Sequence, residues 1–537
     1  MRTIHNKITF ATITLLAFAF CANSYAEDDV LIIEDEDNEI LIIDDAGDDD
    51  LLELTEDHAE DGGETLIIID TNEDDELLII EEDPSGSAEI EVADELELED
   101  EDADLLAVPD TNEPDTDEGE EASANQATAL STAPDASPGA PTFKIDRLWV
   151  EYGHFTKSNS AKNNQGYGHG LAIFEWSPSS QWELKASARA DGYFETGRDD
   201  WSDIGLDYDE TYIRYKAEKS TITVGAQKIL WGRIDEFPPT DRLSTQDIRR
   251  FIIDDLEDRR LASLALRLEH FFDNKKLDLV FYPDFREAQL PDKDSTWYPV
   301  NRQSGEILGL KTNAAQESVV KNASIKENPP DSEGGFGLRF SGIGSTLDYA
   351  LSIQKGRQTL PYFRYNPATN TIEGEYPRTW IVGGDVGFEG LGGTVKFETT
   401  WLSDTPVTRK NGTYTTVESV NWGTALELFP GDGDSRLNLQ LTGTKLIDAP
   451  SVMDRAESYA FNGTYEVPFD DNRWRAKTRF NVGLDEKDIY LNPEIAFTGW
   501  ESQEVYLEWH FFSGAKGTPG GFYEDNSIVA LGWRITL

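Results

Sequence analysis

Residues 435–446 read SRLNLQLTGTKL, in which leucine occupies every second position from Leu437 to Leu441 and polar residues stand between them. Successive side chains of a β-strand point to opposite faces, so this alternation predicts a strand with one apolar and one polar face. The same period of two recurs from residue 143 to the end of the chain. Residues 142–537 are therefore expected to be all-β.

The alternating segments are separated by turns of two kinds. Eighteen strands are expected, at approximately 143–153, 168–177, 181–195, 207–217, 220–228, 261–270, 275–282, 334–342, 345–354, 378–388, 391–402, 417–429, 435–446, 457–468, 472–482, 487–499, 502–512 and 525–537. Short turns follow the even strands, and longer connections follow most odd ones, the longest being 229–260 and 283–333. This pattern predicts an antiparallel transmembrane β-barrel in the outer membrane of a Gram-negative bacterium, where it contacts lipid and lipopolysaccharide.

The last strand and the aromatic residues agree with this prediction. Residues 529–537, VALGWRITL, carry an apolar side chain at every second position, although Leu537 stands where such barrels more often end in an aromatic residue. Aromatic residues also lie beside the short turns, where the interfacial girdles of a barrel are expected. These residues are Trp176, Trp182, Phe388, Phe429, Phe469, Trp500 and Tyr506.

Residues 1–26 have the pattern of a secretory signal peptide. A basic start is followed by an apolar stretch from Ile8 to Phe20 and by the small-x-small sequence Ser24-Tyr25-Ala26. The alternative is a lipoprotein signal peptide in which Cys21 is acylated, but the bulky Phe20 directly before Cys21 disfavours this. Cleavage after Ala26 leaves a chain without cysteine, and therefore without disulfides, in an oxidising compartment.

Residues 27–102 are acidic and carry short aliphatic repeats, and residues 103–141 form a linker rich in Ala, Pro, Ser and Thr. The acids repel one another and the aliphatic blocks are too short to bury a core, so a disordered periplasmic segment is expected. The segment is either a solvating spacer or an array of motifs that add as strands to the sheet of a periplasmic or inner-membrane partner. The candidate partner-binding residues are Leu31, Ile32, Ile33, Leu41, Ile42, Ile43, Leu66, Ile67, Ile68, Leu78, Ile79 and Ile80.

The charge of the chain is unevenly distributed. Residues 1–141 contain 45 acidic and two basic residues, whereas the remainder contains 59 and 44. The first part thus has a formal charge of −43 and the second of −15. A nucleic-acid binder is excluded, because phosphate recognition needs a basic surface.

The inward face of the fifteenth expected strand is basic. If the apolar faces contact lipid, Arg473, Arg475, Lys477 and Arg479 form one inward column. Like charges in a confined space need carboxylates or a substrate to offset them. The candidate carboxylates are Glu466, Glu494, Glu504 and Glu508. The column is either a charge ladder that holds the barrel or a conduction path for anions.

The connection at 229–260, here called the charged loop, is the most densely charged segment of the barrel region. Acids and bases alternate around apolar residues, so the loop is expected to fold and pack. It either narrows the pore or lies outside as a surface loop tied by ion pairs. The candidate constriction residues are Arg233, Asp235, Asp241, Arg242, Arg249, Arg250, Asp254, Asp255, Arg259 and Arg260.

The run from Gly225 to Gly232, GAQKILWG, followed by Asp235 and Asp241, reads as a strand that enters an inward-folding loop. Together with the strand number, it resembles eighteen-stranded outer-membrane porin and exporter barrels, including the alginate-export type. The resemblance covers residues 142–537 at the level of architecture. It implies passive passage of small polar, preferentially anionic, solutes or of a polysaccharide. The acidic repeats depart from that pattern.

The features of the sequence bear on three functions. The first is an outer-membrane channel or exporter whose acidic tail docks a partner or plugs the pore; the second is an anchored adaptor whose repeats recruit a partner. The third, an embedded hydrolase, lacks a Gly-x-Ser-x-Gly turn and a His-Glu-x-x-His site, and His270 and His510 are expected to be interfacial. No enzymatic activity, cofactor or metal is therefore expected.

Overall fold

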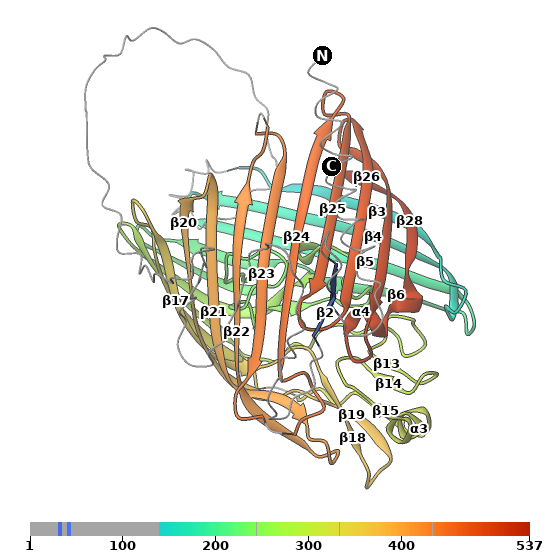
Figure 1. Cartoon of the computed structure of the whole chain (residues 1–537). Coiled ribbons are helices and arrows are strands. Elements are labelled where there is room, and N and C mark those ends of the chain that lie inside the picture. Colours follow the sequence, from blue (N-terminus) through green and yellow to red (C-terminus); the bar gives the residue numbers. More distant parts are fainter. Residues whose placement is uncertain are drawn as a thin grey trace, which may run out of the picture. The chain divides into compact units, whose positions relative to one another are not determined.

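The computed structural model describes residues 31–34, 40–43, 139–242, 244–331, 333–431, 433–449 and 451–537. Its main feature is a closed antiparallel barrel of eighteen strands, in which the last strand pairs with the first strand of the barrel (Figure 1). The expected fold class and strand number are thus confirmed. The structure describes no helix long and apolar enough to cross a membrane among these residues.

The barrel strands follow the expected order. They are β3 (Thr142–Phe155), β4 (Lys162–Ser179), β5 (Trp182–Gly197), β6 (Trp201–Tyr208), β7 (Thr211–Lys216), β8 (Ser220–Gln227), β11 (Ser263–Phe272), β12 (Lys275–Tyr282), β16 (Gly335–Gly342), β17 (Asp348–Arg357), β20 (Arg378–Gly390), β21 (Gly393–Thr408), β22 (Tyr414–Leu428), β23 (Arg436–Leu446), β24 (Glu457–Phe469), β25 (Trp474–Gly483), β26 (Asp488–Trp500), β27 (Gln503–Gly514) and β28 (Ile528–Thr536). Because β6 and β7 are two parts of one interrupted strand, these nineteen segments make eighteen barrel strands. Each of the eighteen pairs with its neighbours in sequence around the ring.

The strand expected at 207–217 is longer and is interrupted. It consists of β6 and β7, and both segments pair with β5. At the break, Ser187 donates its hydroxyl to the carbonyl of Glu210 at 2.5 Å, and the hydroxyl of Thr211 accepts from the backbone N–H of Ser187 at 3.1 Å. Side chains thus supply part of the hydrogen bonding at the break, beside the backbone hydrogen bond from the N–H of Asp209 to the carbonyl of Ser187 at 3.0 Å. The alternation of the sequence does not indicate this interruption.

Alternate side chains of the barrel point to unlike surroundings. Outward residues are mostly large and apolar, and some are very exposed, such as Ile204 and Leu206 on β6 at 81% and 82%. The girdle candidates Trp176, Trp182, Phe388, Phe429, Phe469 and Trp500 are also exposed. Tyr506 is not, because its position on β27 is inward and it is 1% exposed. Its expected place in a girdle is therefore wrong.

The long connections build a small cap at one end of the barrel (Figure 1). The cap consists of β13 (Val300–Asn301), β14 (Glu306–Ile307), α3 (Ala314–Asn322), β15 (Ser324–Lys326), β18 (Tyr362–Asn366) and β19 (Thr371–Glu375). A capping box between Asn313 and Gln316 starts α3. Tyr298, Val320, Ile372 and their neighbours form the apolar core of the cap.

A second apolar cluster lies where loops meet barrel strands. Trp297 from the β12–β16 connection packs with Phe512 on β27 and Tyr523, which lies between α4 (Pro519–Phe522) and η1 (Glu524–Asn526). Ile253 of the charged loop joins the same cluster. The cluster therefore ties the charged loop to the inner side of the barrel near its long-loop end.

Three short elements lie in the charged loop or directly after it: β9 (Thr245–Gln246), α2 (Leu256–Arg259) and β10 (Arg260–Leu261). In the acidic segment, β1 (Leu31–Glu34) pairs antiparallel with β2 (Ile40–Ile43), with Leu31 opposite Ile43. These two repeats form a two-stranded sheet rather than irregular chain. The other repeats lie outside the described residues.

Candidate functional site

The charged loop crosses the interior of the barrel. Arg233 pairs with Asp385 on β20 at 2.6 Å, and Arg250 pairs with Glu151 on β3. Nine steps around the ring of eighteen strands separate β20 from β3 in either direction, so the two strands are diametrically opposed. Both carboxylates are on the inward face, since Asp385 is 2% and Glu151 is 4% exposed. The loop therefore spans the lumen from wall to wall.

Glu398 on β21 holds the first part of the loop. This fully buried carboxylate accepts hydrogen bonds from the backbone N–H groups of Arg233, Ile234 (2.6 Å) and Thr240 (3.3 Å) and from the hydroxyl of Thr240 (2.9 Å). A buried ionised carboxylate needs several donors to offset its lost hydration, and the loop supplies four. Gly232 permits this approach: its φ is +127°, and a Cβ there would lie 2.9 Å from Oε1 of Glu398.

Inward glycines make room for the loop on the barrel wall. A Cβ at Gly337 would lie 2.5 Å from the ring of Trp231, and one at Gly423 would lie 2.6 Å from Cδ1 of Ile234. Since the wall lacks side chains where the loop packs, loop and wall are complementary in shape.

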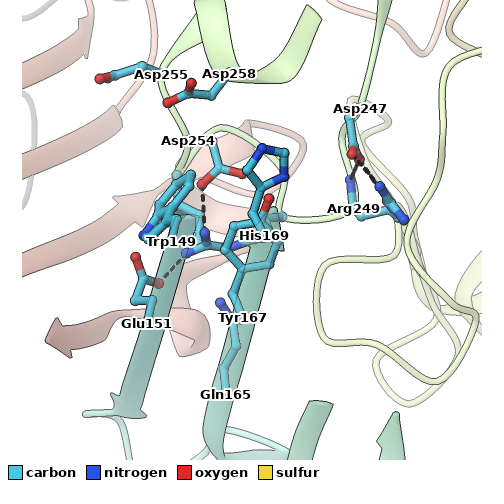
Figure 2. A network of polar contacts seen from close by, with 12 residues as sticks. Trp149, Glu151, Gln165, Tyr167, His169, Asp247, Arg249, Asp254, Asp255 and Asp258 are labelled. Atoms are coloured by element: carbon cyan, nitrogen blue, oxygen red, sulfur yellow. Dashed lines mark hydrogen bonds and ion pairs between the residues drawn. The ribbon is translucent and has the colours of Figure 1, made fainter. Parts of the chain in front are cut away.

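The second half of the loop contacts the opposite wall through Arg250. Its guanidinium lies 4.4 Å from the ring centre of Tyr167 and 5.2 Å from that of Trp149, and it pairs with Asp254 at 2.8 Å. Two carboxylates, Asp254 and Glu151, therefore pair with this guanidinium, and both are labelled in Figure 2. The arginine thus has both charge partners and aromatic faces, an arrangement that a lysine would not reproduce.

Arg249 forms a second link to this wall. It pairs with Asp247 at 2.6 Å (Figure 2). It also pairs with Asp191 on β5 at 3.0 Å and lies 4.5 Å from the ring centre of Tyr193. Arg189 on β5 completes the group, at 3.2 Å from Asp247.

The basic column of β25 meets the loop. Arg475 pairs with Glu494 (3.0 Å) and Glu504 (2.9 Å) on the neighbouring strands. Lys477 and Arg479 pair with Asp255 of the loop, at 2.7 Å and 2.9 Å. Three predicted column residues are thus inward, and carboxylates lie against each of them.

Three other candidates are placed differently. Arg473 precedes β25 in a turn, has a side chain that is 56% exposed and pairs with Asp470, so its expected place in the column is wrong. The reason is the left-handed backbone of the preceding turn, which delays the start of the strand. Glu508 binds Asn492 (3.0 Å) and His510 (3.2 Å). His510 is fully buried and therefore not interfacial.

Glu466 stands opposite Lys477 in the pairing of β24 with β25, and opposite Arg436 in its pairing with β23. Its side chain makes no ion pair among the described residues. It therefore contributes to the charge balance of the column only at longer range.

The remaining loop candidates divide between the loop and the wall. Asp235 reaches Arg436 on β23 at 3.2 Å, and Asp241 pairs with Arg260 at 3.1 Å within the loop. Arg242 donates to the carbonyl of Pro239 at 3.1 Å, and Arg259 lies 3.9 Å from Glu236. All ten charged candidates of the loop therefore contact the loop itself or the inward face of the barrel.

The acids of the loop differ in pKa. Burial raises the pKa of Asp254 to about 7, although Arg250 opposes this shift, and burial raises the pKa of Asp241 to about 6. Asp255 is also buried, but Lys477 and Arg479 lower its pKa well below the usual value. Of Asp254 and Asp241, Asp254 thus titrates nearer to neutral pH.

The residues that capture the loop were not among the candidates. These residues are the acids Glu151, Asp191, Asp385 and Glu398 on four different strands, and nothing in their local sequence distinguishes them from other inward acids. Glycines at inward positions of the strands are the feature of the sequence that could have indicated where the wall binds the loop.

The candidate partner-binding residues are described only in part. Strands β1 and β2 contain Leu31, Ile32, Ile33, Leu41, Ile42 and Ile43. The other candidates lie outside the described residues; they are Leu66, Ile67, Ile68, Leu78, Ile79 and Ile80. Over the residues placed by the structure, no group of three His, Cys, Asp or Glu is arranged to hold a metal ion.

No protein-family model and no curated protein matches the chain. Among solved structures, it is similar to OmpF of Salmonella typhi in a complex with daunomycin, at 10% identity and a TM-score of 0.38, over 74% of this chain and 97% of that one. It is similar to OccAB4 of Acinetobacter baumannii at 9% identity and a TM-score of 0.44, over 75% and 100% of the two chains. Wzi of Escherichia coli, described as a carbohydrate-binding β-barrel involved in group 1 capsule assembly, has 11% identity and a TM-score of 0.38, over 73% and 85%. At these values the similarity carries no inference about function, and the barrel is established by its own strand pairing.

Proposed function

We propose that the protein is an outer-membrane channel for small polar solutes, restricted by the charged loop. The outward face supports the membrane location, because large apolar residues such as Ile204, Leu206 and Val150 are 58–82% exposed and need a nonaqueous environment. A closed barrel leaves no backbone hydrogen bonds unpaired at a sheet edge, as a lipid environment requires.

The observation that carries the proposal is the crossing of the lumen between Asp385 and Glu151. A loop tied to opposite walls narrows the cross-section that is left for a solute, and charged side chains of the loop border it. Such a passage favours small hydrated solutes. Transport of a polysaccharide chain would require the loop to leave the lumen, so small solutes are the preferred class.

We further propose that the channel prefers anions to cations. It rests on Arg475, Lys477 and Arg479 in one inward column. Because each pairs with a carboxylate, the local charge is largely balanced and the preference is expected to be modest.

The experiment is planar-bilayer recording of the full-length protein in a salt gradient. The proposal expects discrete conductance steps and a reversal potential displaced slightly toward that of the anion. A correctly folded barrel that gives no conductance steps would contradict the channel function.

We also propose that the negative charge of the N-terminal segment attracts it either to the basic column in the lumen or to a periplasmic partner. Residues 1–141 have a formal charge of −43, and the lumen contains a basic column. If the segment plugs the pore, deletion of residues 27–141 should raise conductance or opening probability, most clearly at low salt, where screening is least. Unchanged gating at low salt would rule out the plug.

The alternative function is an anchored adaptor, which one observation favours. The repeats Leu31–Glu34 and Ile40–Ile43 pair with each other as strands, and a two-stranded sheet has two edges with free backbone groups. A third strand from a partner can add to such an edge. In that case, peptides of this region should bind periplasmic extract proteins through strand addition, and Ile33→Pro should abolish the binding.

A further inference from the structure

A cluster of cations lies on the outward face of the barrel at its long-loop end. Lys355 and Arg357 end β17, and Arg378 begins β20, where it stands opposite Arg357 in the strand pairing. These positions share the face of Leu351 and Ile353, which are 64% and 38% exposed. The cations therefore stand at the end of the apolar outer surface, not in the lumen.

The cluster carries more positive than negative charge. Glu333 is the carboxylate of the group: it pairs with Arg357 and lies 3.8 Å from Arg378. Lys355 has no carboxylate partner among the residues that the structure places. Its ammonium lies 4.4 Å from the ring centre of Trp380 instead. The cluster thus has three cations and one carboxylate, which lies against Arg357 and Arg378.

Apolar and aromatic groups border the cluster on the membrane side. Trp380 contacts Phe336 edge to face, with ring centres 5.8 Å apart, and the two are 37% and 41% exposed. Further along the same face, Leu351, Ile353 and Val382 present a continuous aliphatic surface. A molecule that covers both areas needs an anionic head and apolar chains.

We propose that Lys355, Arg357 and Arg378 bind the phosphate of a phosphorylated glycolipid of the lipid A type in the outer leaflet. The inference rests on the proposed outer-membrane location, with the long loops on the outside. Guanidinium and ammonium groups donate charge-assisted hydrogen bonds to phosphate oxygens. The lipid's acyl chains lie against Leu351 and Val382, and its sugar lies against Trp380.

A different outward cation at this end of the barrel, Lys445, already has a carboxylate partner and needs no phosphate. Lys445 on β23 is exposed and also lies outward, but it pairs with Glu457 at 2.8 Å. It therefore supplies a matched control, because its removal takes away a surface cation at the same end of the barrel without touching the cluster.

The test is native mass spectrometry of the full-length protein in detergent with EDTA, titrated with bisphosphorylated lipid A and with its dephosphorylated form. Because a cation near a membrane surface contributes to anionic lipid binding, the double variant K355Q/R378Q should bind bisphosphorylated lipid A roughly thirtyfold more weakly. Lys445→Gln should bind as the wild type does, and the dephosphorylated lipid should bind the wild type as weakly as lipid A binds the double variant. Heat-modified mobility on gels checks that each variant is folded.

Equal lipid A affinity of K355Q/R378Q and wild type would overturn the site. Displacement of the lipid by inorganic phosphate at an equal concentration would also overturn it, because the cluster would then bind free phosphate. Conductance recorded from the same samples separates the two proposals. Normal conductance with no lipid discrimination removes only the lipid site, whereas lipid discrimination without conductance removes only the channel.

Discussion

Replacing Glu398 by alanine should release the charged loop from the barrel wall. The carboxylate accepts from Ile234 N at 2.6 Å, Thr240 Oγ1 at 2.9 Å, Thr240 N at 3.3 Å and also from Arg233 N. Each hydrogen bond to a charged group contributes about 1.5–3 kcal/mol, and bonds that share one acceptor are not additive, so a loss of about 4 kcal/mol is expected. This corresponds to roughly a thousandfold change in the ratio of docked to undocked loop.

Amide hydrogen exchange of Ile234 and Thr240 in detergent measures this change directly, because these amides are the donors. Their exchange should accelerate strongly in Glu398→Ala and less in Glu398→Gln, which retains one carbonyl oxygen. Glu418→Ala is the control, since Glu418 bonds Trp401 Nε1 at 3.0 Å on the outward face. Unchanged exchange in a folded Glu398→Ala barrel would refute the role of this carboxylate.

Three further outcomes are expected. Gly232→Ala should loosen the loop as Glu398→Ala does, because its Cβ would meet the carboxylate, whereas Gly412→Ala, at a φ of +82° in open space, should leave loop exchange unchanged. The pKa of Asp254 is raised to about 7 by burial, so its neutral form stabilises the docked loop below the unfolded pKa of about 4, and this contribution is lost as the pH rises to about 7. After correction for intrinsic rates, loop exchange should therefore be slower at pH 5 than at pH 8. Asp254→Asn should reduce this difference, and the remainder should come from Asp241, whose pKa burial raises to about 6. Neutralising Lys477 and Arg479 by glutamine should shift the reversal potential in a salt gradient toward cations; an unshifted potential would place selectivity elsewhere.

The barrel could be predicted because the alternation of residues within each strand identifies the apolar and the polar face of that strand. Alternation such as Leu437, Leu439 and Leu441 needs no knowledge of the neighbours, and the turn residues mark the ends. The interruption between β6 and β7 could not be predicted in this way, because it depends on the side chain of Ser187 on another strand.

The site was predicted in part. The density of charge in residues 229–260 indicated a folded loop, and the register of β25 placed Arg475, Lys477 and Arg479 inward. The partners of the loop could not be predicted, since Glu398 and Glu151 meet it only through the closure of the barrel. A search for glycines at inward positions, such as Gly337 and Gly423, would have indicated where the wall receives the loop.

Exclusion of uncharged polymers of graded size from single channels in planar bilayers tests the central claim most directly, because it measures the width of the passage. If the loop restricts the lumen, the wild-type channel should admit only small polymers, and Glu398→Ala should admit larger ones with a higher conductance. Glu418→Ala should match the wild type. Equal exclusion limits for the wild type and Glu398→Ala, with loop release verified by hydrogen exchange, would contradict the claim that the charged loop restricts the channel.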